Sequence, residues 1–276
     1  MSIEKSGLPI GVFDSGVGGL TVLRALRELM PGENYLYLGD TARVPYGSKS
    51  ADSIVRYAFQ AGNALVSRSI KMLVIACNTA TAVSLEKLAA EYAPLPVVGV
   101  IEPGAAAACA ASGSGNIAVI ATESTVNGKA YQNTICELHP EAKIIARPCP
   151  LFVGLAEEGW TDGELVEAIA ARYLHPLFAE FGSNGPDTLV LGCTHFPVLR
   201  EAIANVAGPG ITIVDSAETT ALKVKNTLSS LSLLNQAGGK GRTRFLATDS
   251  AERFAAVGGS FLGIDIDPTN VSVVDL

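Results

Sequence analysis

Two cysteines stand at matching places in the sequence, each at the end of a short apolar run and each followed directly by polar residues. Residues 73–76 read LVIA before Cys77, and residues 189–192 read LVLG before Cys193. Such runs predict buried strands of a parallel sheet, and open α/β sheets bind ligands at the carboxyl ends of their strands. Two thiols at equivalent strand ends therefore predict a site with one acid/base group on each side of a bound molecule.

A carbon acid that loses a proton from one face and regains it on the other needs a base opposite an acid. A thiol can serve either role near neutral pH if its pKa is modestly lowered. It then needs an imidazole or a carboxylate nearby to share or relay the proton. His195, Asp14 and Glu157 are the candidates, because all three lie in polar segments beside expected strand ends. On composition alone Glu158 is as good a choice as Glu157, and Asp14 has a simpler alternative role as a helix cap.

The other cysteines give no sign of a disulfide framework, a zinc ribbon or a redox pair. The chain has five cysteines, an odd number, and no CxxC motif. Cys109, Cys136 and Cys149 are interpreted as small hydrophobic side chains. We therefore expect free thiols and no metal site.

Composition excludes several classes of protein. The chain has 276 residues, of which 48% are hydrophobic and 17% charged, so it can bury a large core. Its net charge of −7 argues against binding to nucleic acid or to an anionic membrane surface. No apolar run approaches the roughly 20 residues that span a bilayer, and the first residues lack a signal-peptide pattern. We expect a cytoplasmic protein.

Apolar runs alternate with helical patterns along the whole chain, which predicts the α/β class with parallel sheets. A first round of strands ends in the turn 14–19, the loop 39–47 and Cys77, and a second round ends in residues 121–125 and Cys193. We therefore expect two similar lobes, each a mostly parallel sheet flanked by helices, with the active site in the cleft between them. The turn 14–19 lacks the third glycine of a dinucleotide fingerprint, which argues against nucleotide binding.

Four blocks of sequence resemble glutamate racemases, of the aspartate/glutamate racemase superfamily, and the resemblance runs nearly end to end. The blocks are GVFDSGVGGL (11–20), YLGDTARVPYG (37–47), ACNTAT (76–81) and LGCTHFP (191–197). The segment FVGLAE (152–157) resembles the one that carries a supporting glutamate, although Gly154 stands where proline is expected.

The resemblance implies cofactor-independent interconversion of L- and D-glutamate, which supplies D-glutamate for peptidoglycan. It implies that Cys77 takes the proton from the D-enantiomer and Cys193 from the L-enantiomer, with Asp14, His195 and Glu157 in support. The substrate contacts that it implies are Asp14, Ser15, Tyr46, Gly47, Asn78, Thr79, Thr194 and His195. It also implies a homodimer, a second lobe at residues 98–208 and a discontinuous first lobe at residues 1–97 and 209–276.

Three alternatives stay open. Racemisation of aspartate or another acidic compound would use the same chemistry in a pocket of different length. A non-catalytic, two-lobed protein that binds a small anion would not require thiols. A thiol redox enzyme is disfavoured because CxxC is absent.

Overall fold

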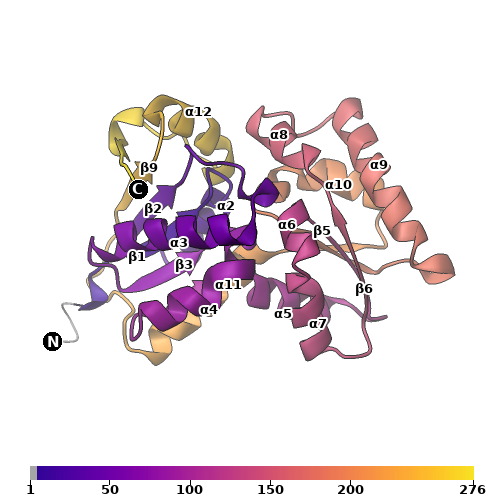
Figure 1. Cartoon of the computed structure of the whole chain (residues 1–276), viewed down its shortest axis with the longest axis horizontal. Coiled ribbons are helices and arrows are strands. Elements are labelled where there is room, and N and C mark those ends of the chain that lie inside the picture. The colour runs from indigo at the N-terminus through magenta and orange to yellow at the C-terminus, as the bar shows by residue number, and fades with distance from the viewer. Residues whose placement is uncertain (1–4) are drawn as a thin grey trace.

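The computed structural model describes residues 5–276, and in it two parallel sheets lie side by side (Figure 1). The six-stranded sheet has the order β10-β9-β2-β1-β3-β4, and the four-stranded sheet has the order β6-β5-β7-β8. The strands are β1 (Ile10–Asp14), β2 (Tyr35–Gly39), β3 (Met72–Ile75), β4 (Val97–Gly99), β5 (Asn116–Ala121), β6 (Lys143–Pro148), β7 (Thr188–Gly192), β8 (Thr212–Asp215), β9 (Thr243–Ala247) and β10 (Val271–Val273).

Helices cover both faces of each sheet. On the six-stranded sheet, α2, α11 and α12 pack on one face, and α3 and α4 pack on the other. On the four-stranded sheet, α8, α9 and α10 pack on one face, and α5 and α7 on the other. The helices are α2 (Leu20–Leu29), α3 (Ala51–Val66), α4 (Asn78–Glu91), α5 (Ile101–Ala111), α6 (Glu123–Asn127), α7 (Ala130–Leu138), α8 (Leu151–Glu157), α9 (Glu164–Ala179), α10 (Arg200–Ala207), α11 (Ser216–Ser230) and α12 (Ala251–Leu262).

The central strands are apolar on both faces because helices cover both sides. All five residues of β1, of β2 and of β7 are buried. Two tyrosines of β2 keep their hydroxyl groups satisfied in this interior. Tyr35 donates to the Leu26 carbonyl at 2.8 Å, and Tyr37 donates to the Gly16 carbonyl at 2.9 Å. The second bond ties the turn after β1 to the core.

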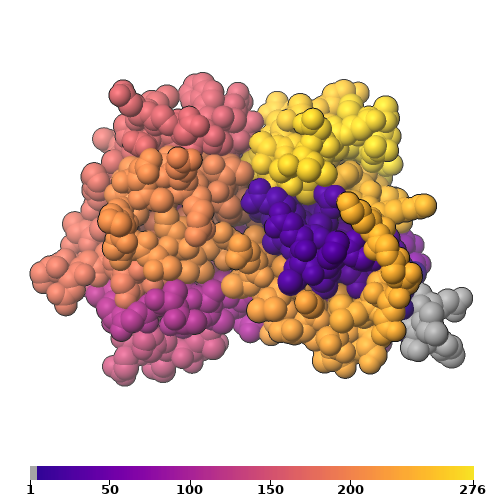
Figure 2. Space-filling model, turned by 180° about the vertical axis from the view of Figure 1, so that it is seen from behind, coloured from indigo at the N-terminus to yellow at the C-terminus, as the bar shows by residue number. Residues whose placement is uncertain are grey.

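The C-terminal part of the chain returns to the first sheet, where β9 pairs with β2. Figure 2 shows this C-terminal part, in yellow, beside the indigo N-terminal part. The prediction of an α/β protein with two parallel, helix-flanked sheets is confirmed. No helix within residues 5–276 is long and apolar enough to cross a membrane.

The two sheets divide the chain at places other than the expected lobe boundaries. The second lobe was expected at 98–208, yet Val98 and Gly99 belong to β4, which pairs with β3 in the first sheet. Residues 212–215 form β8, which pairs with β7 in the second sheet, although they were expected in the first lobe. We propose that the lobes follow the sheets, so that the chain crosses between them near residues 100 and 216.

Candidate active site

Cys77 follows β3 and is the N-cap residue of α4. Its Sγ accepts a hydrogen bond from the Ala80 backbone N–H at 3.4 Å and lies 3.6 Å from the Ser15 hydroxyl oxygen, to which the thiol donates. Only 5% of the residue is exposed. Burial, followed by the negative charge of Asp14, raises the pKa of the Cys77 thiol to about 12. Cys77 is therefore a protonated thiol, an acid, at neutral pH.

Cys193 follows β7 and lies beside an imidazole. Its Sγ is 3.8 Å from Nδ1 of His195, whose Nε2 is 3.2 Å from Oε1 of Glu157. Burial lowers the pKa of His195, but the hydrogen bonds to Cys193 and Glu157 outweigh it and raise this pKa to about 10. The same hydrogen bond to His195 lowers the pKa of Glu157. His195 is therefore a cation at neutral pH.

Asp14 is the last residue of β1 and lies close to the segments that carry the two cysteines. Gly16 N–H donates to its Oδ2 at 2.9 Å, and the Thr194 hydroxyl donates to its Oδ1 at 3.4 Å. The residue is fully buried, and this burial raises the pKa of its carboxyl group, although the His195 cation opposes the shift. Since its charge acts on both Cys77 and His195, Asp14 couples the two sides electrostatically.

The turn after β1, residues 15–19, packs closely against the segment that carries Cys193. A Cβ atom on Gly18 would lie 2.5 Å from both His195 Nδ1 and Thr194 Oγ1, so only glycine fits this approach. Thr21, in the first turn of α2, donates to the Thr194 carbonyl at 3.3 Å. These contacts join elements more than 170 residues apart and bring the carboxyl ends of β1 and β7 together.

A cluster of polar side chains lines the side of the site next to Cys77. The Tyr131 hydroxyl donates to Oδ1 of Asn78 at 2.8 Å, whereas Nδ2 of Asn78 is buried and has no hydrogen-bond partner among residues 5–276. The Thr79 hydroxyl lies 2.9 Å from that of Thr122 and 3.2 Å from that of Thr125. Asn78 thus holds a buried N–H donor that is available to a ligand.

Tyr46 and Gly47 belong to the loop after β2. The Tyr46 hydroxyl forms a short hydrogen bond to the buried carboxylate of Asp40, which also binds Arg43 and Thr248. Gly47 packs against Thr122, with no room for a side chain. The loop is therefore held by Asp40 and contacts Thr122, which follows β5 of the second sheet.

The structure thus brings the expected site residues together, all of them buried except Gly47 and Glu157, which are half-buried. It also distinguishes Glu157, which contacts His195, from the exposed Glu158. Asp14 does not cap α2, whose N-cap residue is Gly19. Sequence reasoning missed Asp40, Thr122, Thr125 and Tyr131. Two signals were present: residues 121–125 were an expected strand end, and Asp40 stood in a loop rich in turn residues.

This arrangement can move a proton across a bound molecule. It offers a protonated thiol at Cys77, a second buried cysteine, Cys193, next to an imidazolium, and the buried carboxyl group of Asp14. The Ser15 hydroxyl and the unpartnered amide N–H of Asn78 can donate hydrogen bonds to carboxylates.

Comparison with known proteins agrees with this chemistry. The profile of the Asp/Glu/Hydantoin racemase family matches residues 10–224. The glutamate racemase of Geobacter metallireducens is 48% identical over 254 residues, which is 92% of each chain. The solved glutamate racemase of Francisella tularensis in complex with D-glutamate is 34% identical with a TM-score of 0.89, over 98% of each chain. That of Thermus thermophilus in complex with β-chloro-D-alanine is 42% identical with a TM-score of 0.86, also over 98% of each chain. The chain belongs to the Asp/Glu/Hydantoin racemase family.

Proposed function

We propose that this chain interconverts L- and D-glutamate and that Cys77 and Cys193 are the two acid/base groups, acting on opposite faces of Cα. The choice of glutamate rests on the relatives named above, one of which holds D-glutamate. The observation that carries the mechanism is a pair of buried strand-end cysteines close enough to interact electrostatically, with the buried carboxyl group of Asp14 near both segments.

The two thiols have unequal surroundings, which gives each a starting role. Cys77 is held as a thiol because burial and Asp14 raise its pKa to about 12. Cys193 lies beside the His195 cation, with 3.8 Å between its Sγ and Nδ1 of the ring. We propose that Cys193 is the base that removes the Cα proton of L-glutamate and that Cys77 is the acid that protonates Cα to give D-glutamate. These are the roles that the sequence resemblance implies.

In the L-to-D direction the Cys193 thiolate takes the Cα proton, and the electron pair of the broken C–H bond stays on the substrate. The Cys77 S–H bond then breaks as a new C–H bond forms on the opposite face. The turnover ends with a thiol at Cys193 and a thiolate at Cys77, the state from which D-glutamate reacts. Before the next L-to-D turnover the Cys193 thiol must give up its proton and the Cys77 thiolate must regain one, both by exchange with water. We propose that His195, beside Cys193, and Asp14, whose charge acts on Cys77, assist this exchange.

Glutamate carries two carboxylates, and the site offers donors to hold them. The unpartnered Nδ2 of Asn78 is a buried donor beside Cys77. The hydroxyl groups of Ser15, Thr79 and Thr194 are buried as well. We propose that the Tyr46–Gly47 segment, which packs against Thr122, supplies backbone N–H groups as well. Charge-assisted hydrogen bonds of this kind are the strong class and fix the orientation of a carboxylate.

Circular dichroism of L-glutamate and of D-glutamate, each incubated with the purified chain, tests the proposal. We expect both enantiomers to reach the same racemic end point, with L-aspartate unchanged under the same conditions. Racemisation of aspartate in preference to glutamate would instead support the alternative that the chain is a racemase of aspartate. Binding of glutamate without any optical change would indicate a binding protein instead.

Four further features remain predictions. We propose that the reaction needs no cofactor, since two side-chain acid/base groups suffice, and that it survives chelators and removal of pyridoxal phosphate. We propose that the product supplies peptidoglycan synthesis in the cytoplasm. A homodimer is expected from the resemblance, and light scattering during size-exclusion chromatography measures it.

A further inference from the structure

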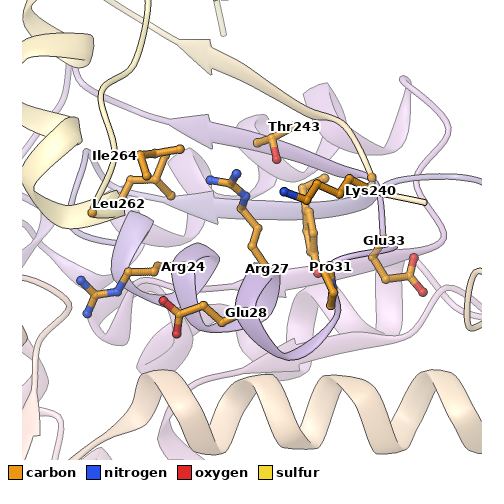
Figure 3. A pocket seen from close by; sticks show the side chains of 12 residues that line it. Arg24, Arg27, Glu28, Pro31, Glu33, Lys240, Thr243, Leu262 and Ile264 are labelled. Carbon is orange, nitrogen blue, oxygen red and sulfur yellow. The ribbon is translucent and has the colours of Figure 1, made fainter. Parts of the chain in front are cut away.

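A separate cavity of about 290 Å³ lies where α2 ends and β9 begins (Figure 3). Its walls come from α2, from the segment before β9 and from the end of α12, and none of its lining residues belongs to the candidate active site. Three cations line it: Arg24, Arg27 and Lys240. This concentration of positive charge is unexpected in a chain with a net charge of −7.

Arg24 and Lys240 are exposed, and Arg27 is half-buried, where its charge acts on the hydroxyl group of Tyr35. Within residues 5–276, the side chains of Arg24, Arg27 and Lys240 make no ion pair and no hydrogen bond. Figure 3 shows the tips of Arg27 and Lys240 turned toward each other near the Thr243 hydroxyl. A cation in the last turn of a helix is favourable in itself, which accounts for Arg27. It does not account for Lys240, which approaches from another segment.

The two carboxylates of the lining do not neutralise this pair. Glu33 is engaged elsewhere: its Oε2 forms an ion pair with the buried Lys71, and its Oε1 accepts a hydrogen bond from the Asn235 backbone N–H at 2.7 Å. Glu28 lies on the exposed rim, next to Arg24. The centre of the cavity, between Arg27 and Lys240, therefore keeps an uncompensated positive charge.

The backbone holds Lys240 in this position. Gly241 N–H donates to the Pro31 carbonyl at 2.8 Å. A Cβ atom on Gly241 would lie 1.8 Å from the Glu33 carbonyl oxygen, so the chain here is packed tightly against the loop that follows α2. Lys240 is thus carried by a backbone segment that is anchored beside the end of α2.

We propose that this cavity binds a phosphorylated small molecule. Two cations from different directions and the Thr243 hydroxyl suit the several acceptor oxygens of a phosphate. Leu262, Ile264 and Pro31 supply apolar wall for the organic part of the ligand. The phosphate lies between Arg27 and Lys240, and the organic part lies toward Leu262 and Ile264.

Isothermal titration calorimetry with the purified full chain tests the site, with phenyl phosphate, inorganic phosphate and phenol as probes. We expect phenyl phosphate to bind more tightly than inorganic phosphate and phenol not to bind. We expect Arg27→Gln and Lys240→Gln each to weaken phenyl phosphate binding about tenfold, because each removes a charge-assisted hydrogen bond.

Arg172→Gln is the matched control. Arg172 is exposed, lies outside the cavity and carries the same charge, so this variant should bind phenyl phosphate as the unaltered chain does. Equal binding by all three variants, or no binding at millimolar phenyl phosphate, would overturn the proposal. Glutamate racemisation measured in the same samples reports on the active site separately, so failure of one proposal is distinguishable from failure of the other.

Discussion

Replacing Gly18 with alanine tests how closely the turn after β1 fits the segment that carries Cys193. The new Cβ would lie 2.5 Å from His195 Nδ1, whereas ordinary contacts begin at 3.4 Å, so about 0.9 Å must be made up by movement. His195 has little freedom to move. Its ring packs edge-on against Phe261 at 5.3 Å, and its Nε2 is bound to Glu157.

The expected loss follows from this displacement. A misplacement of about 1 Å in a catalytic group costs on the order of 100-fold in rate, and 100-fold corresponds to about 2.7 kcal/mol of transition-state stabilisation. Overpacking a close contact also costs about 1–3 kcal/mol of stability. We therefore expect Gly18→Ala to lower kcat/KM for both enantiomers about 100-fold and to lower the thermal midpoint of unfolding by several degrees.

Steady-state polarimetry with L- and D-glutamate measures the first effect, and thermal unfolding followed by circular dichroism measures the second. Gly154→Ala is the matched control, because a Cβ at Gly154 meets nothing within 4 Å and the residue lies in helix α8. That variant should keep its activity. A folded Gly18→Ala variant with kcat/KM close to the unaltered value would refute the contact between the turn and His195.

Two more predictions concern the His195 pair. Glu157→Gln removes the carboxylate that helps to raise the pKa of His195, so the alkaline limb of the kcat/KM profile should move to lower pH and the rate should fall about tenfold. The control variant Glu158→Gln should have the same profile as the unaltered enzyme. An identical shift in both variants would contradict the pairing of Glu157 with His195. The pKa of His195 is raised from 6.5 to about 10, so its stabilising effect is complete below pH 6.5 and is lost as the pH rises toward 10. The free energy of unfolding should therefore decrease as the pH rises across this range, and in His195→Asn it should decrease less. Urea titrations at several pH values measure this dependence. The same pH dependence in His195→Asn and in the unaltered chain would contradict the pairing of His195 with Cys193 and Glu157.

The sequence was sufficient to predict where the central strands end and which two cysteines lie at those ends. Apolar runs buried on both faces mark β3 and β7 plainly, and the residue after each run must lie at the carboxyl edge of its sheet. The lobe boundaries were harder to predict. Strand β4 has only three residues, and β8 is exposed at its first residue, so neither strand shows which sheet it joins.

The polar side chains that line the site could not be predicted from local sequence patterns either. Tyr131 reaches Asn78 from a helix 53 residues away in the sequence. Thr122 meets Thr79 only because α4, beside the first sheet, contacts the start of α6, which follows β5 of the second sheet. The choice between Glu157 and Glu158 depended on which way the last turn of α8 faces. These contacts are set by packing between distant segments, which one sequence does not specify.

The central claim is that two thiols act on opposite faces of one carbon atom. The most direct measurement is proton NMR of L- and D-glutamate in heavy water with the unaltered chain, Cys77→Ala and Cys193→Ala. The account predicts product labelled with deuterium at Cα for the unaltered chain and no racemisation by either variant, with any remaining exchange restricted to L-glutamate in Cys77→Ala and to D-glutamate in Cys193→Ala. Racemisation near the unaltered rate by either folded variant, or product without deuterium at Cα, would contradict it.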